Sequence, residues 1–418
     1  MPKQIVILGA LDSKGLEHAY LRDQIAAQGL DPFVVDFGVL GAPTFAPDIS
    51  SAEVAAAAGA DLAQLRATND RGAALAAMAR GAAATLLRLH AEGRVDGVVG
   101  MGGGGGSSVI ATAMRALPLA VPKLLVSTMA SGDTQPYVGT SNIAMMPAIV
   151  DVAGLNRISR QIISQAAGAI VGMARIEPPA VGGERPLVAA SMFGNTTACV
   201  DRCRAAIEAA GYEVLVFHAT GAGGRTMESL VREGFISGVL DITTTEWADE
   251  LAGGVLSAGP TRLEAAGAAG VPQLVVPGCI DMVNFGPQAS VPAHYADRQL
   301  YAWNSTVTLM RTTVGENAEL GRIFAEKLNA ARGLVHVLIP LRGYSILDSP
   351  GERFWEPEAD AAFVGALRAD LRADIPIEEL DLNINDSAFA ERAVTIMLEL
   401  LRESGRQGDR ERGRQGEC

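Results

Sequence analysis

Cysteine is scarce in this sequence, which has only Cys199, Cys203, Cys279 and Cys418 among 418 residues. Four thiols are too few to hold a chain of this length together, which excludes a disulfide-based scaffold. Cys199 and Cys203 stand four residues apart in a predicted helix, where they could share a metal ion. No other thiol or histidine pair lies nearby in the sequence. We therefore interpret Cys199 and Cys203 as small buried hydrophobic residues and predict no metal site.

Aromatic residues and long apolar runs are also few. Phe, Trp and Tyr make up 5% of the chain, a balance that favours packed α/β layers of small and branched side chains. No apolar run reaches the roughly 18 residues needed to span a bilayer. The N-terminal stretch MPKQIVILG is followed at once by charged residues, without a small-residue cleavage site. We therefore expect a first β-strand and a cytoplasmic protein rather than a signal peptide.

Basic residues are fewer than acidic ones: the chain has 34 Lys and Arg and 47 Asp and Glu, which gives a formal net charge of −13. Such a chain does not suit a nucleic-acid backbone or an anionic membrane surface. We therefore expect neither nucleic acid nor membrane as a partner; the glycine-rich loops at 102–106 and 221–224 instead predict a nucleotide and a small-molecule anion. A homo-oligomer, most simply a homodimer, is the default expectation for a protein of this kind.

Apolar runs typical of strands alternate with helical periodicity along the whole chain, and the pattern restarts after a stretch rich in Pro and Gly. The predicted fold class is α/β, with two Rossmann-like doubly wound parallel-sheet domains and an interdomain cleft. We predict an N-terminal nucleotide-binding domain over 1–175, a linker over 176–186 and a C-terminal Rossmann-like α/β domain over 187–403. The polar tail over 404–418 is expected to be disordered.

The stretch VDGVVGMGGGGGSSVIATAM, residues 95–114, carries five consecutive glycines between a predicted strand and a predicted helix. This order aims backbone N–H groups at a phosphate or carboxylate, although glycines also form tight turns between packed elements. It is not a Walker A loop, because the lysine after the last glycine is missing. No acidic residue follows at the position that a nicotinamide dinucleotide site requires. We therefore favour a nucleotide phosphate, with contacts from Gly102, Gly103, Gly104, Gly105, Gly106, Ser107 and Ser108.

Polar residues follow two other predicted strands of the first domain, at the edge of the sheet where ligands bind. Lys14 would supply the cation that the glycine loop lacks, although a solvated lysine in a first helical turn is an equal alternative. Asp133 would hold Mg²⁺ through water, or would cap a turn. The candidate nucleotide contacts at these strand ends are Asp12, Ser13, Lys14, Ser131, Gly132 and Asp133.

The second domain repeats the glycine-loop pattern in TGAGGRTMESLV, where a small carboxylate or phosphate could bind. Glu246 and Asp249 are acid/base candidates, and Arg311 in LMRTT suits a carboxylate clamp. Each of these residues alone is more often a cap or a surface group, but together they follow neighbouring strands. The predicted catalytic residues are Lys14, Glu246, Asp281 and Arg311, and the predicted substrate contacts are Gly223, Gly224, Arg225 and Asn284. Among the histidines, His218 is best placed for a site, whereas His90 and His336 look structural.

Several motifs in one order carry a resemblance to a known family: GALDSKG, GMGGGGGSS, SMFGNTT, HATGAGGRTMESL, DITTTEWADEL, PGCIDMVNFG, LMRTT and PLRGYSILDSPGERFWEPEAD. They resemble a largely uncharacterised bacterial family related to the N-terminal ATP-binding domain of the tomato mosaic virus resistance protein. The resemblance covers about residues 3–402 and implies two Rossmann-like subdomains, with ATP at residues 102–108. Family members often carry His-Asn before LMRTT, where this chain has Trp303 and Asn304, so a proton-transfer role of that histidine is not implied here.

Three functions follow from these observations. The first is an ATP- and Mg²⁺-dependent enzyme that transfers a phosphoryl or adenylyl group to a small anionic metabolite, by positioning and charge neutralisation. The second is a nucleotide-binding regulatory or scaffold protein without turnover, which the resemblance suggests because the plant relative inhibits a viral replication protein. The third, an oxidoreductase with a nicotinamide cofactor, rests on fold analogy alone.

Overall fold

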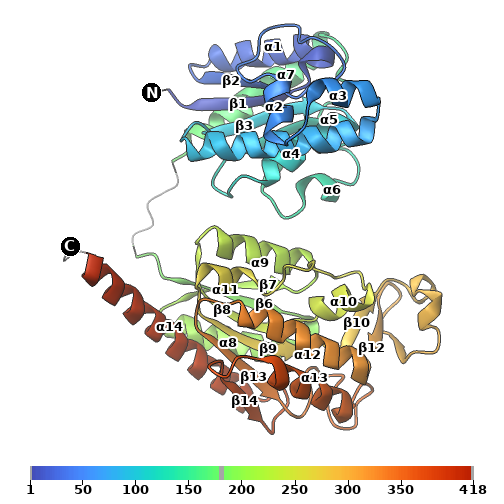
Figure 1. Cartoon of the computed structure of the whole chain (residues 1–418), viewed down its shortest axis with the longest axis vertical. Helices are drawn as coiled ribbons and strands as arrows, with labels where there is room; N and C mark the ends of the chain where they lie inside the picture. The colour runs from blue at the N-terminus through green and yellow to red at the C-terminus, as the bar shows by residue number, and fades with distance from the viewer. Residues whose placement is uncertain (1, 178–182, 416–418) are drawn as a thin grey trace. The chain divides into compact units, whose positions relative to one another are not determined.

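The chain folds into two compact α/β units, residues 1–180 and 181–418 (Figure 1). The structure is a computed structural model that describes residues 2–177 and 183–415, with side chains described as far as Arg406. Part of the predicted linker, 178–182, lies outside the described residues. In both units, helices cover the two faces of a parallel sheet, which confirms the predicted α/β class.

The first unit is built on a five-stranded parallel sheet with the order β2-β1-β3-β4-β5. This is the flavodoxin-like order, in which the chain first moves outward from β1 and then crosses to its other side. The switch point lies between β1 and β3. The strands are β1 (Gln4–Gly9), β2 (Asp31–Asp36), β3 (Gly97–Gly102), β4 (Lys123–Ser127) and β5 (Ile143–Pro147).

Two apolar cores hold helices against the two faces of this sheet. Helices α1 and α7 cover one face, where Ile7, Met101 and Ile170 are buried together. Helices α2, α4 and α5 cover the other face around Leu8, Leu86 and Ile110. The helices are α1 (Leu11–Ala26), α2 (Ser51–Ala57), α3 (Leu62–Thr68), α4 (Arg71–Ala91), α5 (Gly104–Arg115), α6 (Gln135–Val138) and α7 (Arg157–Arg175).

The second unit contains a six-stranded parallel sheet with the order β14-β13-β9-β8-β6-β7. The chain again starts in the interior of the sheet and reverses direction, here between β6 and β8. The pattern of strands and helices that restarts in the second half of the sequence therefore corresponds to a similar strand topology in the two units. The strands are β6 (Leu187–Met192), β7 (Glu213–His218), β8 (Ile236–Thr243), β9 (Gln273–Gly278), β13 (Val335–Pro340) and β14 (Ile377–Leu380).

Helices α8 and α14 pack on one face of the second sheet, while α9 and α11 to α13 lie on the opposite side, with α12 crossing α13. Their bounds are α8 (Thr197–Ala209), α9 (Ala222–Arg232), α10 (Glu246–Ala252), α11 (Ala265–Ala269), α12 (Val314–Asn329), α13 (Pro357–Asp370) and α14 (Ser387–Gln415). Short 3₁₀ turns are η1 (Gly194–Thr196), η2 (Gln288–Ser290) and η3 (Ala293–Tyr295).

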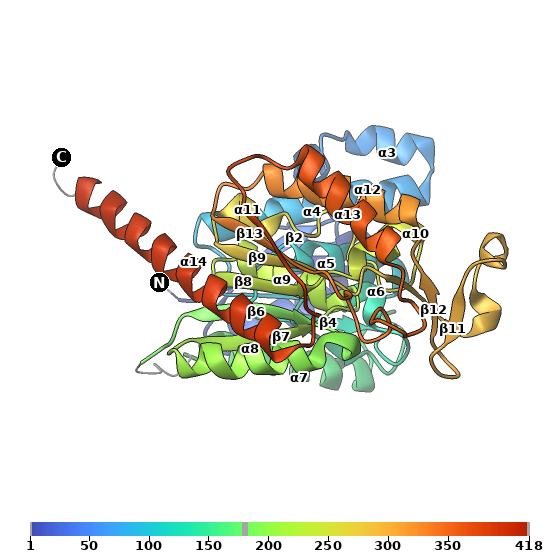
Figure 2. The ribbon, with the colours of Figure 1, turned by 90° about the horizontal axis from the view of Figure 1, so that it is seen from below.

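The structure differs from the sequence-based expectation in two places. Three short strands, β10 (Met282–Phe285), β11 (Leu300–Ala302) and β12 (Thr308–Arg311), form a small antiparallel sheet that projects from one end of the second unit. The tail expected to be disordered from residue 404 instead continues helix α14 to Gln415, which extends away from the body of its unit (Figures 1 and 2). Its Arg, Glu and Gln residues are good helix formers, and no proline interrupts them.

Candidate functional site

The switch point of the first sheet brings together the chain segments that follow β1 and β3. In open parallel sheets, this position is where ligands bind. Glycines 102 to 106 run from the end of β3 into α5, with Gly103 as the N-cap and Gly104 as the first helical residue. The predicted order of strand, glycines and helix is therefore present, and three of the five glycines form the first turn of the helix.

The N-terminus of α5 has no side-chain cap, because Gly103 carries no acceptor. Among the described residues, no acceptor bonds the backbone N–H groups of Gly104, Gly105 or Gly106, and the first intrahelical bond is from Ser107 N–H to Gly103 C=O at 2.8 Å. Free N–H groups and the positive end of the helix dipole together attract an anion.

Helix α1, which follows the neighbouring strand β1, is different. The Oδ1 of buried Asp36 accepts hydrogen bonds from the N–H groups of Leu11 at 3.0 Å and Gly38 at 2.8 Å. Burial raises the pKa of Asp36, and these two hydrogen bonds partly offset that effect. The protein's own carboxylate therefore occupies the start of α1, whereas the start of α5 is open.

Neither backbone conformation nor packing requires glycine at most of the α5 turn. A Cβ added to Gly103 or Gly104 would meet its nearest atom at 3.8 or 3.9 Å, and at Gly106 nothing lies within 4 Å. Gly102 is different, because a Cβ there would lie 3.0 Å from the backbone nitrogen of Ser107. Glycine leaves space next to free N–H groups at positions where a larger side chain would fit, which suits a site that a ligand approaches closely.

The residues after β1 take part in internal contacts. Oδ2 of Asp12 accepts the N–H groups of Leu40 at 2.6 Å and Gly41 at 3.2 Å, so Asp12 fixes the loop after β2. Ser13 is exposed and bonds only weakly, to the carbonyl of Ala10 at 3.5 Å. The ammonium of half-buried Lys14 donates to the carbonyl of Val152. In the part of the chain that the structure describes, no carboxylate lies within ion-pair distance of Lys14.

The serines of the glycine loop have separate roles. Ser107 is buried and its hydroxyl lies 2.6 Å from that of Ser127, at the end of β4, so it is not available to a ligand in this structure. Ser108 is exposed on the first turn of α5. Thr128, directly after β4, is exposed and faces Gly103, since a Cβ added to that glycine would lie 3.8 Å from its hydroxyl. Thr128 is a candidate that the sequence analysis did not name, because no motif marks it.

The loop after β4 also carries Ser131, Gly132 and Asp133, all of them exposed. Oδ1 of Asp133 accepts the N–H of Gln135 at 3.0 Å. Asp133 therefore caps a turn, which was the alternative to a Mg²⁺ contact, while its second oxygen stays exposed.

In the second unit, the predicted anion loop is already filled. Oε1 of Glu246 accepts the N–H groups of Gly221 at 2.7 Å and Gly224 at 3.0 Å, at the start of α9. A Cβ on Gly224 would lie 2.1 Å from Oε2 of Glu246. Gly223 packs against the carbonyl of His218, and Arg225 donates to the carbonyl of Ser257 at 2.7 Å. The predicted substrate contacts of this loop are thus used inside the fold.

Glu246 belongs to a buried ion cluster around Arg262, which is 1% exposed. Arg262 binds Asp241 through two hydrogen bonds of 2.5 and 2.7 Å and Glu246 through one of 2.7 Å, and it lies 3.4 Å from Glu228. Burial raises the pKa of Glu228, and the charge of Arg262 opposes that rise. Arg262 and Asp241 were not predicted, because GPTRLEAAG resembles an ordinary helix start and Asp241 lies inside an apolar strand.

Arg311 forms a second buried cluster with acidic residues. Its Nη2 lies 2.9 Å from Asp360 and 3.3 Å from Asp348, and its Nε donates to the carbonyl of Phe354 at 2.7 Å. Asp281 is fully buried and accepts the hydroxyl of Ser345 at 2.8 Å. Burial raises the pKa of Asp281 to about 6, although Arg311 opposes the effect. The predicted carboxylate clamp therefore holds carboxylates of this chain.

Asp249 and Asn284 form a third buried pair. Oδ2 of Asp249 accepts the side-chain amide of Asn284 at 2.7 Å, and its Oδ1 accepts the N–H groups of Asn284 at 3.1 Å and Leu256 at 3.2 Å. Burial raises the pKa of Asp249 to about 7. The amide oxygen of Asn284 is buried without a hydrogen-bond partner.

Cys199 and Cys203 are buried in the core beneath α8 and α14, as the hydrophobic interpretation expects. Within residues 2–177 and 183–415, no group of three or more His, Cys, Asp and Glu is arranged to hold a metal ion. His218 is exposed at the end of β7, with its ring 5.4 Å from that of Phe193. His336 is partly buried in β13, 3.7 Å from Glu378.

Comparison with known proteins identifies the family. The N-terminal domain model of an uncharacterised protein family, UPF0261, matches residues 3–179, and its C-terminal domain model matches residues 185–401. This chain belongs to that family. The assignment agrees with the resemblance drawn from the sequence motifs.

Relatives from bacteria and a plant match over long stretches. A UPF0261 protein of Clostridium tetani is 49% identical over 93% of this chain and 97% of its own length, and one of Rhizobium meliloti is 47% identical over 94% and 98%. The tomato (Solanum lycopersicum) ToMV resistance protein Tm-1(GCR237) is 42% identical over 79% of this chain, which corresponds to 45% of the tomato protein.

Among solved structures, UDP-GlcNAc 2-epimerase of Methanocaldococcus jannaschii covers 65% of this chain and 83% of its own, at 11% identity and a TM-score of 0.22. A likeness at this level does not bear on function.

None of the helices in the described residues combines the length and apolar character that a membrane crossing demands.

Proposed function

We propose that this protein binds a nucleoside triphosphate, most simply ATP with Mg²⁺, through the start of α5 at the switch point of the first sheet. The observation that carries the proposal is the uncapped first turn of α5, where Gly104, Gly105 and Gly106 present free N–H groups, with open space beside the first and the last. Phosphate oxygens satisfy such groups and are stabilised by the helix dipole. ATP is the nucleotide that the family resemblance implies.

Lys14 supports this proposal as a candidate cation. It follows β1, the strand next to β3, and donates to a backbone carbonyl rather than to a carboxylate. A lysine ammonium without an anionic partner can exchange a carbonyl for a phosphate oxygen at a gain in charge complementarity. Arg71, at the start of α4, is a second candidate, since its Nη2 would lie 3.6 Å from a Cβ on Gly105. Mg²⁺ would accompany the phosphates, and the exposed carboxylate of Asp133 is the candidate that would reach it through water.

In the enzymatic version of the proposal, the nucleotide gives up a phosphoryl or adenylyl group to a small anionic metabolite. The acceptor site predicted in the second unit has little support, because Glu246, Asp281 and Arg311 are buried and satisfied by other groups of the chain. That observation favours the second candidate, a regulatory protein in which the nucleotide is bound without turnover.

Isothermal titration of the full chain with Mg²⁺-ATP tests the binding proposal. Gly104→Asp places a carboxylate at the first position of α5, where it stabilises the helix and repels phosphate. Gly104 is exposed and has room for a side chain, so the variant should fold. Gly104→Ala is the matched control, with a similar backbone and no charge. We expect wild type and Gly104→Ala to bind Mg²⁺-ATP and Gly104→Asp to lose binding. Equal binding by all three proteins would contradict a phosphate site at the start of α5.

A second assay separates turnover from binding. Release of phosphate, diphosphate or AMP from ATP is followed in the presence of Mg²⁺ and a broad panel of small carboxylic and hydroxy acids. Turnover by wild type that Gly104→Asp abolishes would establish the enzyme. Tight binding without any product, across the panel, would leave the regulatory candidate.

The proposal also places the protein in the cytoplasm and expects a homodimer. The location is supported by the acidic composition, which does not suit an anionic membrane surface, and the homodimer by the prevalence of symmetric homo-oligomers among soluble proteins. Light scattering on the purified chain measures the oligomeric state, and fractionation of cells measures the location. A monomer at micromolar concentration would remove the dimer from the proposal without affecting nucleotide binding.

A further inference from the structure

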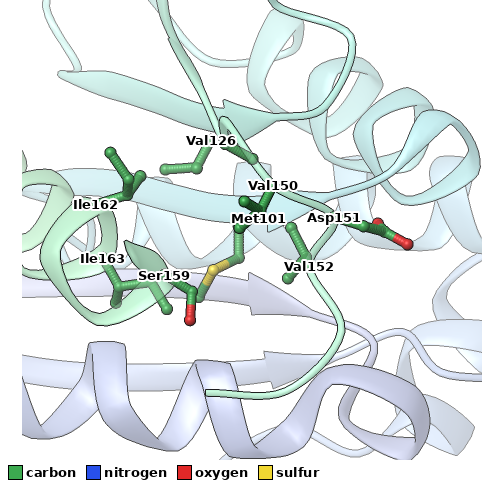
Figure 3. Close-up of a pocket in the computed structure, with 9 residues that line it drawn as sticks. Met101, Val126, Val150, Asp151, Val152, Ser159, Ile162 and Ile163 are labelled. Atoms are coloured by element: carbon green, nitrogen blue, oxygen red, sulfur yellow. The ribbon is translucent and has the colours of Figure 1, made fainter. Parts of the chain in front are cut away.

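The hollow shown in Figure 3 lies in the packed core of the first unit, between the carboxyl ends of β3 and β4 and helix α7. Its walls include the side chains of Met101, Val126 and Ile163, and it has room for about one water molecule. It is a small gap in the packing. An organic ligand of this protein therefore needs an open position at the edge of a sheet.

Such a position lies at the switch point of the second sheet, between β6 and β8. The chain leaves β6 through Phe193 and the 3₁₀ turn η1, and it enters α8 at Thr197. The hydroxyl of Thr196 accepts the N–H of Phe193 at 3.1 Å and lies 2.7 Å from the hydroxyl of Thr243, at the end of β8. The turn is therefore fixed to the neighbouring strand, at the edge of the sheet where ligands bind.

The start of α8 offers backbone donors to an anion. Its N-cap, Thr196, makes no side-chain capping bond to the helix. Among the described residues, no acceptor bonds the backbone N–H groups of Gly194 and Asn195. Gly194 is exposed and a Cβ added there would meet nothing within 4 Å, so the space beside it is open. A carboxylate can accept both N–H groups and is stabilised by the helix dipole.

The side chain of Asn195 indicates a ligand that also carries a hydrogen-bond donor. Asn195 is 4% exposed, but its carboxamide is poorly satisfied. Its Nδ2 has only a thioether partner, Sδ of Met282 at 3.5 Å, and its Oδ1 accepts no hydrogen bond within the described residues. Because the two polar atoms of a carboxamide diverge, Oδ1 is directed away from Met282. An unsatisfied polar group on a largely buried side chain costs free energy, and a donor on a ligand would remove that cost.

Aromatic side chains border the same turn. Phe193, directly after β6, is half-buried, and its ring lies 5.4 Å from that of exposed His218, the last residue of β7. Phe193 also packs, together with Tyr301, on a small apolar cluster that includes Met282. Aromatic rings of this kind bind apolar or aromatic groups. The free donors of the turn therefore lie next to a surface that suits the body of an organic acid.

We propose that the start of α8 binds a small organic carboxylate with a hydroxyl or amino group on the adjacent carbon and an apolar side group. The carboxylate accepts the N–H groups of Gly194 and Asn195, and the hydroxyl or amino group donates to Oδ1 of Asn195. The side group lies against Phe193 and His218. This site goes beyond the proposed nucleotide site, because it lies in the other unit and needs no nucleotide. In the enzymatic version of the proposed function, such an acid is the class of acceptor.

Isothermal titration of the full chain with three related acids tests the ligand class. Phenyllactate carries the hydroxyl, phenylalanine carries the amino group, and phenylacetate has neither. We expect phenylacetate to bind about tenfold more weakly than the tighter of the other two, because it leaves Oδ1 of Asn195 without a donor. The tighter of the two identifies the donor as hydroxyl or amino. Binding of phenylacetate as tight as that of both others, or no binding of any acid, would overturn the proposal.

A charge placed in the open space tests the position. Gly194→Asp adds a carboxylate at an exposed position before α8, where it suits the helix dipole and repels an acid. It should weaken binding of the tighter acid about tenfold or more, whereas the matched control Gly194→Ala should stay within about threefold of wild type. Unchanged acid binding by Gly194→Asp would overturn the site. If that variant does not fold, the comparison of the three acids on wild type still decides.

The two proposed sites are separated by exchanging their variants. Gly194→Asp should bind Mg²⁺-ATP as wild type does, and Gly104→Asp should bind the tighter acid as wild type does. Loss of acid binding in Gly104→Asp would overturn the site at α8. Failure of wild type to bind ATP, with the acid still bound, would overturn the proposed nucleotide function and support the separate acid site.

Discussion

The carboxylate of Glu246 accepts a hydrogen bond of 3.0 Å from the backbone N–H of Gly224, and so occupies the start of α9 from inside the protein. The start of α5 in the first unit has no such carboxylate. The two glycine turns have similar sequences but differ in their hydrogen bonding. The N–H groups of the α9 turn donate to a carboxylate of the chain, whereas those of the α5 turn are free for an external anion. The difference lies in a residue that stands 22 positions away from its partner along the chain.

A matched pair of glycine substitutions measures this difference. Gly224→Ala places a Cβ 2.1 Å from Glu246, which must leave both its N–H donors and Arg262. We expect the free energy of unfolding of the second unit to fall by about 3 kcal/mol, the order seen when a buried ion pair is broken. Gly104→Ala has room and replaces glycine in a helix, so stability should stay constant or rise by up to about 1 kcal/mol. Urea denaturation of both variants checks this, and equal losses would contradict the assigned roles.

Buried Asp249 predicts a pH dependence of stability. Its pKa is raised from 3.8 to about 7 by burial, so the folded state binds a proton that the unfolded state has released. The contribution of Asp249 to stability is therefore fully present below about pH 4, is lost as the pH rises toward 7, and amounts to up to about 4 kcal/mol. Asp249→Asn removes the titrating group, and rotation of the Asn284 amide lets its unpartnered oxygen accept the new N–H.

Urea denaturation of wild type and Asp249→Asn between pH 4.5 and 8 measures this effect. The variant should lose less stability over that interval than wild type does, although buried Asp281, with a pKa of about 6, contributes in the same direction in both. Asp297→Asn, at an exposed position, is the control that should follow wild type. Parallel curves for wild type and Asp249→Asn would show that Asp249 is ionised in the folded state throughout.

Lys14 is predicted to strengthen nucleotide binding through its charge. Lys14→Met should weaken Mg²⁺-ATP binding about tenfold, which corresponds to roughly 1.4 kcal/mol and lies near the lower end expected for a charged hydrogen bond. Lys14→Arg retains the charge and should stay within about threefold of wild type. Isothermal titration of the three proteins checks the prediction. If Lys14→Met binds ATP as wild type does, the ammonium only holds the carbonyl of Val152.

The fold class was predictable from the sequence because strands and helices are indicated by patterns within short, contiguous segments. Apolar strands such as QIVILG and amphipathic helices such as α7 (Arg157–Arg175) are indicated by periodicity, and the alternation of the two specifies parallel sheets. The glycine turn of α5 was also predictable, since strand, glycines and helix are contiguous. The antiparallel sheet was missed, because its strands of three and four residues, such as Thr308–Arg311, are too short for a clear period.

The state of each candidate site residue was less predictable, because it depends on partners far along the chain. Arg311 has the expected chemistry for a carboxylate clamp, but Asp348 and Asp360, 37 and 49 residues away, already use it. Glu246 is acidic at a strand end as predicted, yet Arg262 and the α9 turn hold it. Residue type and strand position indicate where polar groups gather, and only the three-dimensional pairing decides which of them are free.

The strained turn at Ile149 gives a last prediction. Ile149 is 71% exposed and has a φ of +63°, so its β-branched side chain is strained and buries little apolar surface. Asparagine adopts a positive φ several-fold more often than a β-branched residue does, and strain there amounts to about 1–3 kcal/mol. Ile149→Asn should therefore raise the free energy of unfolding of the first unit by about 1 kcal/mol, as measured by urea denaturation. Ile158→Asn, at an exposed helical position, should change it by less than about 0.5 kcal/mol. A loss of stability in Ile149→Asn would mean that the isoleucine makes contacts that outweigh its strain.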